Sequence, residues 1–156
     1  MISLKQRSIT HEDQSVPFLP KGLCVLGGAQ LPDGDLLVCG GNTAKEGWEF
    51  CSGPEAKEGW KNDDYLVLRK GSKSWSSIGR MLEPRSNHSS LFINGSVFSC
   101  GGKDMAKNIS SHHEEFRMNG SVNERKELPV KLVGHTIVKL ASKKYMLIGG
   151  LGKNVS

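Results

Sequence analysis

Short apolar segments separated by glycine-rich turns recur along this chain of 156 residues. The clearest example is 86–102, where two apolar runs flank Asn94-Gly95 and the second run ends at Gly101-Gly102. Asn-Gly is the strongest two-residue turn signal, because a type I′ turn needs a positive φ at both central residues. We therefore predict a β-hairpin here. Two further hairpins with the same layout are predicted at 23–41 and 134–150.

The segments between the hairpins predict two more strands each. After the first hairpin these are 64–69 and 74–78, and after the second they are 113–118 and 124–128. The Gly-Gly pairs that end the hairpins mark a repeat of roughly 40–50 residues once an insertion is set aside. Four short strands in a repeat of this length indicate an all-β architecture.

The repeats define the expected domain organisation. Residues 1–21 are expected to be a poorly ordered segment or an edge strand, since prolines confine a strand to an edge. Residues 22–152 hold the repeats, and 153–156 form a tail. The insertion 42–62 contains AKEGW twice, at 44–48 and 56–60.

The duplicated segment places Trp48 and Trp60 beside glycines. Tryptophan is enriched in binding hot spots, so these side chains are candidate protein-binding anchors on a protruding loop. The alternative is a duplication in a surface loop that has no function.

The strand-Gly-Gly motifs resemble the kelch repeat. They read LLVCGG at 36–41, VFSCGG at 97–102 and YMLIGG at 145–150, and the first is completed by the strand and Trp75 of DDYLVLRKGSKSW at 63–75. The resemblance implies a β-propeller of four-stranded antiparallel blades. The chain would supply two blades and the inner hairpin of a third, which is an incomplete kelch-type β-propeller, since rings close with typically 4–8 blades. We expect a fragment or truncated relative of a longer protein, or self-association that completes the ring.

Charge and composition exclude several partner classes. The formal net charge is +5, and no Lys/Arg run is interleaved with stacking aromatics, which favours a solvated basic face over nucleic-acid binding. No apolar run approaches the length of a membrane helix, and the N-terminus lacks the apolar core of a secretory signal. The four cysteines match no metal spacing and fit small buried residues in a reducing compartment. We therefore expect a cytoplasmic protein that binds no nucleic acid and no membrane.

Two histidines invite a metal hypothesis. His88 and His135 occupy similar positions near the start of an inner strand, so two repeats could aim both toward a central channel. Two histidines do not make a specific metal site, and we expect packing to explain the coincidence. No nucleophile elbow or phosphate loop is present, so we expect no metal, no cofactor and no catalysis.

The resemblance also implies a binding surface. Kelch modules that recognise proteins do so over loops near the channel mouth, which hold the residues after Gly-Gly and those before the inner strand. The corresponding residues here are Asn42, Arg85, Asn87, His88, Lys103, Asp104 and His135. Arg85 is the foremost candidate, because its planar donors suit carboxylates.

These observations predict a non-enzymatic protein-interaction module of kelch type. By resemblance it would be a ubiquitin-ligase substrate adaptor or a cytoskeletal scaffold fragment. The alternatives are a propeller enzyme or carbohydrate-binding module that uses His88 and His135, or a truncated fragment without function.

Overall fold

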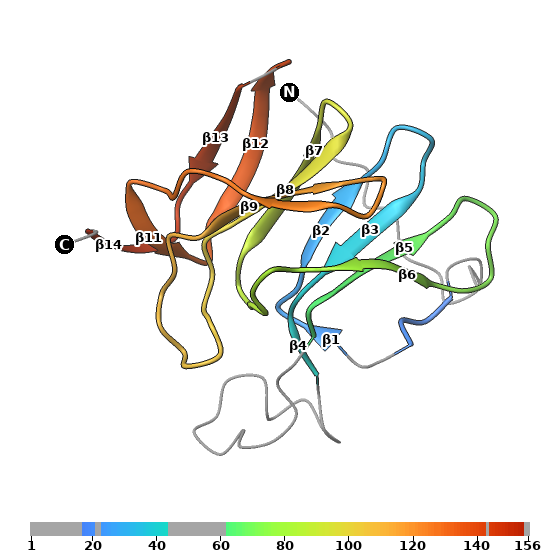
Figure 1. Ribbon diagram of the computed structural model, residues 1–156, viewed down its shortest axis with the longest axis horizontal. Helices are drawn as coiled ribbons and strands as arrows, with labels where there is room; N and C mark the ends of the chain where they lie inside the picture. Colours follow the sequence, from blue (N-terminus) through green and yellow to red (C-terminus); the bar gives the residue numbers. More distant parts are fainter. Residues whose placement is uncertain (1–16, 21–22, 44–61, 143, 155–156) are drawn as a thin grey trace, which may run out of the picture.

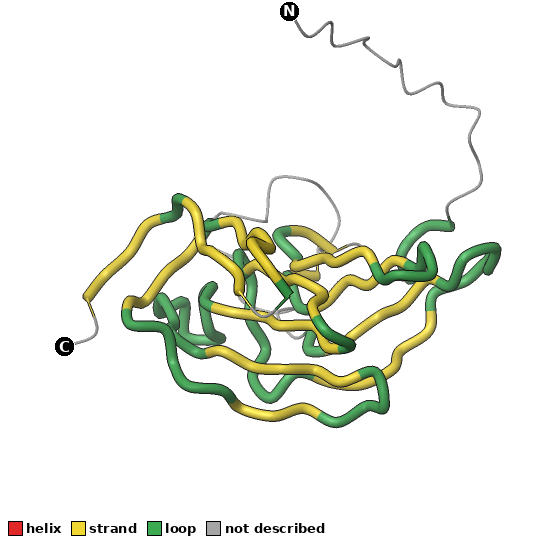
Figure 2. The backbone as a smooth tube through the Cα atoms, turned by 90° about the horizontal axis from the view of Figure 1, so that it is seen from above, coloured by secondary structure: helices red, strands yellow, loops and turns green. Residues whose placement is uncertain are grey.

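The computed structural model describes residues 17–20, 23–43, 62–142 and 144–154, and this part of the chain consists of strands and loops without a helix (Figures 1 and 2). The all-β class and the four-stranded antiparallel sheets are therefore confirmed. Within the same ranges, no helix long and apolar enough to cross a membrane is present.

Two four-stranded sheets and a third hairpin form the body of the molecule. The first sheet has the order β2-β3-β5-β6, with β2 (Gly27–Gln30), β3 (Leu36–Cys39), β5 (Asp64–Leu68) and β6 (Ser76–Arg80). The second has the order β10-β9-β8-β7, with β7 (Ser89–Ile93), β8 (Ser96–Cys100), β9 (His113–Arg117) and β10 (Val122–Glu124). The third hairpin joins β12 (Thr136–Ala141) to β13 (Lys144–Ile148).

Two short strand pairs lie beside the hairpins. They join β1 (Leu23–Cys24) to β4 (Asn42–Thr43) and β11 (Val130–Val133) to β14 (Leu151–Asn154). The sequence did not predict these pairs: β11 lies between the predicted strand 124–128 and the predicted hairpin 134–150, and β14 spans the end of the repeats and the start of the predicted tail 153–156. Each pair joins the segment that enters a hairpin to the segment that leaves it.

All three predicted hairpins form. In the central one, Asn94 and Gly95 have φ values of 51° and 85°, as the predicted type I′ turn requires. Ser89 then pairs with Cys100 across the ladder. The hairpins β2-β3, β7-β8 and β12-β13 lie side by side in Figure 1, and β7 contacts both β2 and β12.

The outer strands differ from the prediction. β6 begins two residues later than expected, and β10 occupies 122–124 rather than 124–128. The turn at Asn119-Gly120 is tight, because the Asn119 side chain accepts the Ser121 N–H at 3.0 Å. The chain therefore re-enters the sheet at once, and the charged residues after Glu124 form a connection instead of a strand.

The three hairpins are copies of one backbone arrangement. A left-handed residue precedes each inner strand: Val25, Asn87 and Gly134, with φ values of 51°, 54° and 67°. The Asn87 N–H donates to the Val25 carbonyl at 2.9 Å, and the Gly134 N–H donates to the Asn87 carbonyl at 3.0 Å. Equivalent pairs close the three copies: Cys24 with Asn42, Ser86 with Lys103, and Val133 with Leu151. These matches align the repeats residue by residue.

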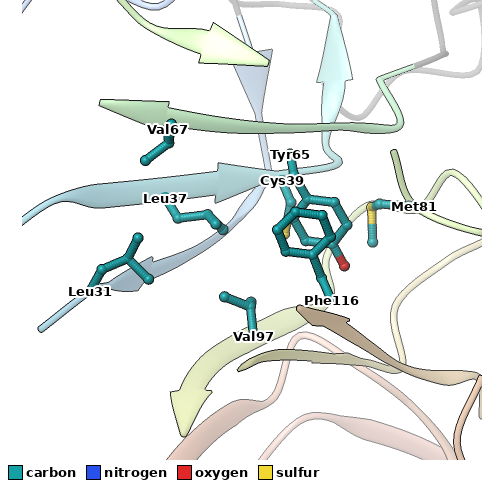
Figure 3. Close-up of a cluster of buried hydrophobic side chains, with 8 residues drawn as sticks. All are labelled: Leu31, Leu37, Cys39, Tyr65, Val67, Met81, Val97 and Phe116. Carbon is teal, nitrogen blue, oxygen red and sulfur yellow. The ribbon is translucent and has the colours of Figure 1, made fainter. Parts of the chain in front are cut away.

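The main core lies between the two four-stranded sheets (Figure 3). Leu37 and Val67 come from the first sheet, and Val97 and Phe116 from the second. The Tyr65 and Phe116 rings stack across the junction with centroids 4.0 Å apart. A smaller cluster of Cys100, Leu128 and Ile137 joins the second sheet to the third hairpin.

Part of the N-terminal segment and most of the insertion lie outside the described residues. Within 17–20 the backbone forms no strand, and the Pro17 carbonyl accepts the Trp75 indole N–H at 3.0 Å. The candidate anchors Trp48 and Trp60 are among the residues that the structure does not describe.

Candidate functional site

Both junctions between repeats are built around a cysteine and a histidine. Cys39, at the end of β3, lies 3.5 Å from His88 Nε2, measured from the sulfur. Cys100, at the end of β8, lies at the same distance from His135 Nε2. The similar hairpin positions of His88 and His135 thus reflect a repeated packing contact, in which each ring closes the preceding repeat.

Glycine makes room for these contacts. A Cβ on Gly40 would lie 2.6 Å from the Arg85 carbonyl oxygen and 2.7 Å from His88 Cε1. A Cβ on Gly101 would lie 2.4 Å from the Leu132 carbonyl oxygen and 2.7 Å from His135 Cε1. Both glycines also have a positive φ. The Gly-Gly motif is therefore required by the backbone of the following repeat.

A buried carboxylate organises the loop that enters the second repeat. Glu114, in β9, accepts the Tyr65 hydroxyl at 2.7 Å and the Leu82 N–H at 3.2 Å. The Arg85 guanidinium donates to the second Glu114 oxygen at 3.3 Å and to the His112 carbonyl at 3.1 Å. The Arg85 side chain is only 1% exposed. Its guanidinium therefore joins the loop to β9 inside the protein and does not reach the surface.

Burial keeps the junction groups neutral. It lowers the pKa of His88 to about 3, assisted by the positive charge of Arg85, and it also lowers the pKa of His135. Burial raises the pKa of both Cys39 and Cys100 to about 11. A reactive thiolate needs a depressed pKa. These pairs therefore lack the electrostatics of a cysteine nucleophile, and their arrangement suits packing.

The loops that follow the Gly-Gly pairs meet the loops that enter the hairpins, and they form one surface. We call it the loop surface, and define it as Asn42, Asn87, Lys103, Asp104 and Leu151. Lys103 connects its two parts, because it lines both the hollow that includes Asn87 and the hollow that includes Asp104. Asp104 accepts two hydrogen bonds from Asn108, at 2.8 and 3.1 Å, which fixes the loop after Lys103. Four of the sequence-predicted residues therefore gather here.

A hollow of about 320 Å³ lies on the loop surface. Its lining combines polar groups with an apolar part: Asn87, Lys103, Val133, Gly134, Gly150 and Leu151. Sequence reasoning missed Val133 and Leu151. Extending the repeat would have found Leu151, because it follows Gly149-Gly150 as Asn42 and Lys103 follow their own glycine pairs.

The remaining predicted residues are distributed differently. His88, His135 and Arg85 are buried and do not belong to the loop surface, and Asn42, which does, is itself only 7% exposed. Among the residues that the structure describes, no group of three or more His, Cys, Asp or Glu side chains is placed to hold a metal ion.

The described fold and surface define a repetitive all-β protein with antiparallel four-stranded sheets. No family model and no curated protein matches the sequence. Among solved structures, 124 chains match the fold. One is the structure of YjhT, which is 16% identical with a TM-score of 0.62 and covers 82% of this chain. The chain spans about a third (34%) of the length of YjhT, and the likeness concerns the fold alone.

Proposed function

We propose that this chain is a non-catalytic protein-interaction module of kelch type, with its repeats arranged as blades of an incomplete β-propeller. The proposal is supported by the three-fold repetition of the same hairpin, Gly-Gly turn and closing backbone pair. The observation that carries the binding role is the loop surface, where the entry and exit loops of successive repeats converge on one hollow.

The chemistry of the hollow suggests the kind of partner segment it takes. Val133 and Leu151 supply an apolar wall, while Lys103 and Asn87 supply donors. A volume of about 320 Å³ is at the small end of ligand pockets and fits one or two side chains. We propose that the partner presents an apolar side chain next to a carboxylate, which Lys103 pairs with.

The buried cysteines favour a reducing compartment for this interaction. Cys39 and Cys100 are both free and buried, and each serves as a junction residue. A cytoplasmic role as a substrate adaptor or as a scaffold fits these features. The enzymatic alternative has no comparable support, since His88 and His135 are closed off inside the two junctions.

The binding role is tested by charge reversal on the loop surface. The tagged full chain and its Lys103→Glu variant are used for affinity purification with quantitative mass spectrometry. Each protein recovered is then purified and titrated directly. We expect a partner whose affinity falls at least tenfold with Lys103→Glu, because the substitution places a carboxylate against the partner's own.

Lys73→Glu is the matched control. Lys73 is exposed in the connection between β5 and β6, and its reversal changes the net charge by the same amount. If both variants weaken a partner equally, the attraction is a general charge effect and the assigned surface is wrong. If no recovered protein binds the full chain directly, the interaction-module proposal fails.

A further inference from the structure

The junction between repeats is an interface that the chain forms twice. One side of the interface is the end of an inner hairpin with its Gly-Gly pair. The other side is the segment that leads into the next hairpin, which is 85–88 at the first junction and 132–135 at the second. The Gly41 N–H donates to the Arg85 carbonyl, and the Gly102 N–H donates to the Leu132 carbonyl, both at 2.8 Å. The alignment of the repeats shows what a third junction of this kind would contain.

The third hairpin presents the first side of this interface, and no described repeat packs against it. Gly149 corresponds to Gly40 and Gly101, yet nothing in the described chain lies within 4 Å of a Cβ placed on it. Ile148 corresponds to Cys39 and Cys100, which are completely buried, but it is 48% exposed. Met146, on the same face of β13, is 44% exposed, whereas its counterpart Leu37 is 1% exposed.

The first repeat presents the second side of the interface. Leu26 follows the left-handed residue Val25, as His88 follows Asn87 and His135 follows Gly134. Side chains alternate along β3, so Leu36 and Val38 face away from the core that holds Leu37 and Cys39. Leu36 is 38% exposed.

The residues at the two open ends match each other in chemistry. Inside the molecule a cysteine thiol meets a histidine ring at both junctions. At the open ends the equivalent positions are Ile148 and Leu26, so an apolar side chain would meet an apolar side chain. A histidine against Ile148, or a cysteine against Leu26, would lose its polar partner. Both positions of the pair are therefore polar at the internal junctions and apolar at the open ends.

We propose that the open face of β12-β13 binds the β1-β2-β3 end of a second copy of this chain, in continuation of the internal junctions. Leu26 of the second copy packs on Ile148 and Met146, and its Leu23 carbonyl accepts the Gly150 N–H. The contact is head to tail, because two different faces of the chain meet. Repetition of such a contact gives either a closed ring or a longer array.

The proposal is tested by sedimentation velocity on the full chain. We expect the wild-type chain to sediment as an assembly of two or more copies. Leu26→Asp and Ile148→Asp should each reduce it to a single copy, because a carboxylate would be buried against an apolar side chain. An equimolar mixture of the two variants should restore a two-copy species, since each retains the face that the other has lost.

The controls separate this contact from other modes of association. Leu82→Asp changes an equally exposed apolar residue in the β6-β7 loop and should leave the wild-type mass unchanged. Assembly that survives Leu26→Asp but not Ile148→Asp would mean that two β12-β13 faces meet, which overturns the head-to-tail contact. A wild-type chain that sediments as one copy, or a mixture that does not reassociate, also overturns it.

A smaller substitution guards against loss of folding. Circular dichroism melts are recorded for every variant, and Gly149→Ala replaces any variant that lacks a cooperative transition. Alanine strains the backbone at the positive φ of Gly149, but its methyl group meets open space in the single chain. In the assembly the methyl group would clash with the incoming Leu23 carbonyl, as the equivalent carbons would at Gly40 and Gly101. A folded Gly149→Ala chain that keeps the wild-type mass contradicts the proposal.

Discussion

His88 shows how an ordinary titratable residue becomes part of the packing. Its ring lies against Cys39 and beneath the first Gly-Gly pair, and it is 5% exposed. The sequence revealed that His88 and His135 occupy matching hairpin positions. It could not reveal their partners, because Cys39 is 49 residues away and the contact depends on how two sheets stack. Arg85 is a similar case, since its burial follows from Glu114 in the centre of the second sheet.

Acid should destabilise the protein through His88. The folded chain holds the pKa of His88 at about 3, while an unfolded histidine has a pKa of about 6.5. Below pH 6.5 the unfolded state therefore binds a proton that the folded state excludes, and the free energy of unfolding falls as the pH drops toward 3. One such group contributes a loss of about 1.4 kcal/mol per pH unit.

The His88→Leu variant tests this pH dependence. Leucine already occupies the corresponding position of the first repeat as Leu26. Between pH 6.5 and 5, urea unfolding should show a loss smaller than that of the wild type by about 2 kcal/mol. Equal losses in the two chains would show that His88 does not exclude the proton.

At the scale of elements, local turn chemistry determined what could be predicted. The three hairpins were predictable because glycine in the turns, such as Asn94-Gly95 and Gly34, and in the Gly-Gly pairs permits the positive φ values that these positions require. The two short pairs β1-β4 and β11-β14 were not, because each joins segments that lie on opposite sides of a hairpin and are far apart in the sequence. The position of β10 depended on a side-chain contact of Asn119 that composition does not encode.

The junction glycines should be less replaceable than the turn glycines. Gly101→Ala and Gly95→Ala both place an L-residue at a positive φ, which costs roughly 1–2 kcal/mol. Only Gly101→Ala adds a clash, with the Leu132 carbonyl and the His135 ring, since Gly95 has open space around it. We expect Gly101→Ala to be the more destabilising by about 1–3 kcal/mol. Thermal or urea unfolding of both variants measures the difference, and equal stabilities would refute the close contact.

For the whole molecule, the order of the repeats determines how well each hairpin is buried from solvent. The β7-β8 hairpin is packed on both faces, by the first sheet and by the third hairpin. Among the residues that the structure describes, the β12-β13 hairpin is packed on one face, and its other face is exposed. The sequence pattern gave the number of hairpins and their class. Which hairpin is central followed from the junction contacts.

Hydrogen exchange should reveal this difference in burial between the β7-β8 and β12-β13 hairpins. In the Ile148→Asp chain, the amides of β8 should exchange slowest and those of β13 fastest, because local opening is easiest where few apolar contacts are lost. In the assembled wild-type chain, the amides of β13 should become slower while those of β8 change little. Mass-spectrometric exchange of both chains provides the measurement. Uniform protection along the two hairpins would contradict this order.

The placement of each closing residue in the following repeat determines where the chain can be divided. A cut after Gly102 respects the sequence repeat, yet it removes the His135 ring and the Leu132 carbonyl that cover Cys100 and Gly101. The natural unit of this protein is therefore offset from its motif. It runs from the inner strand of one hairpin through the entry of the next, so that Cys39 stays with His88 and Cys100 with His135. Pieces intended to fold alone, or to be exchanged between related proteins, should be divided by that unit.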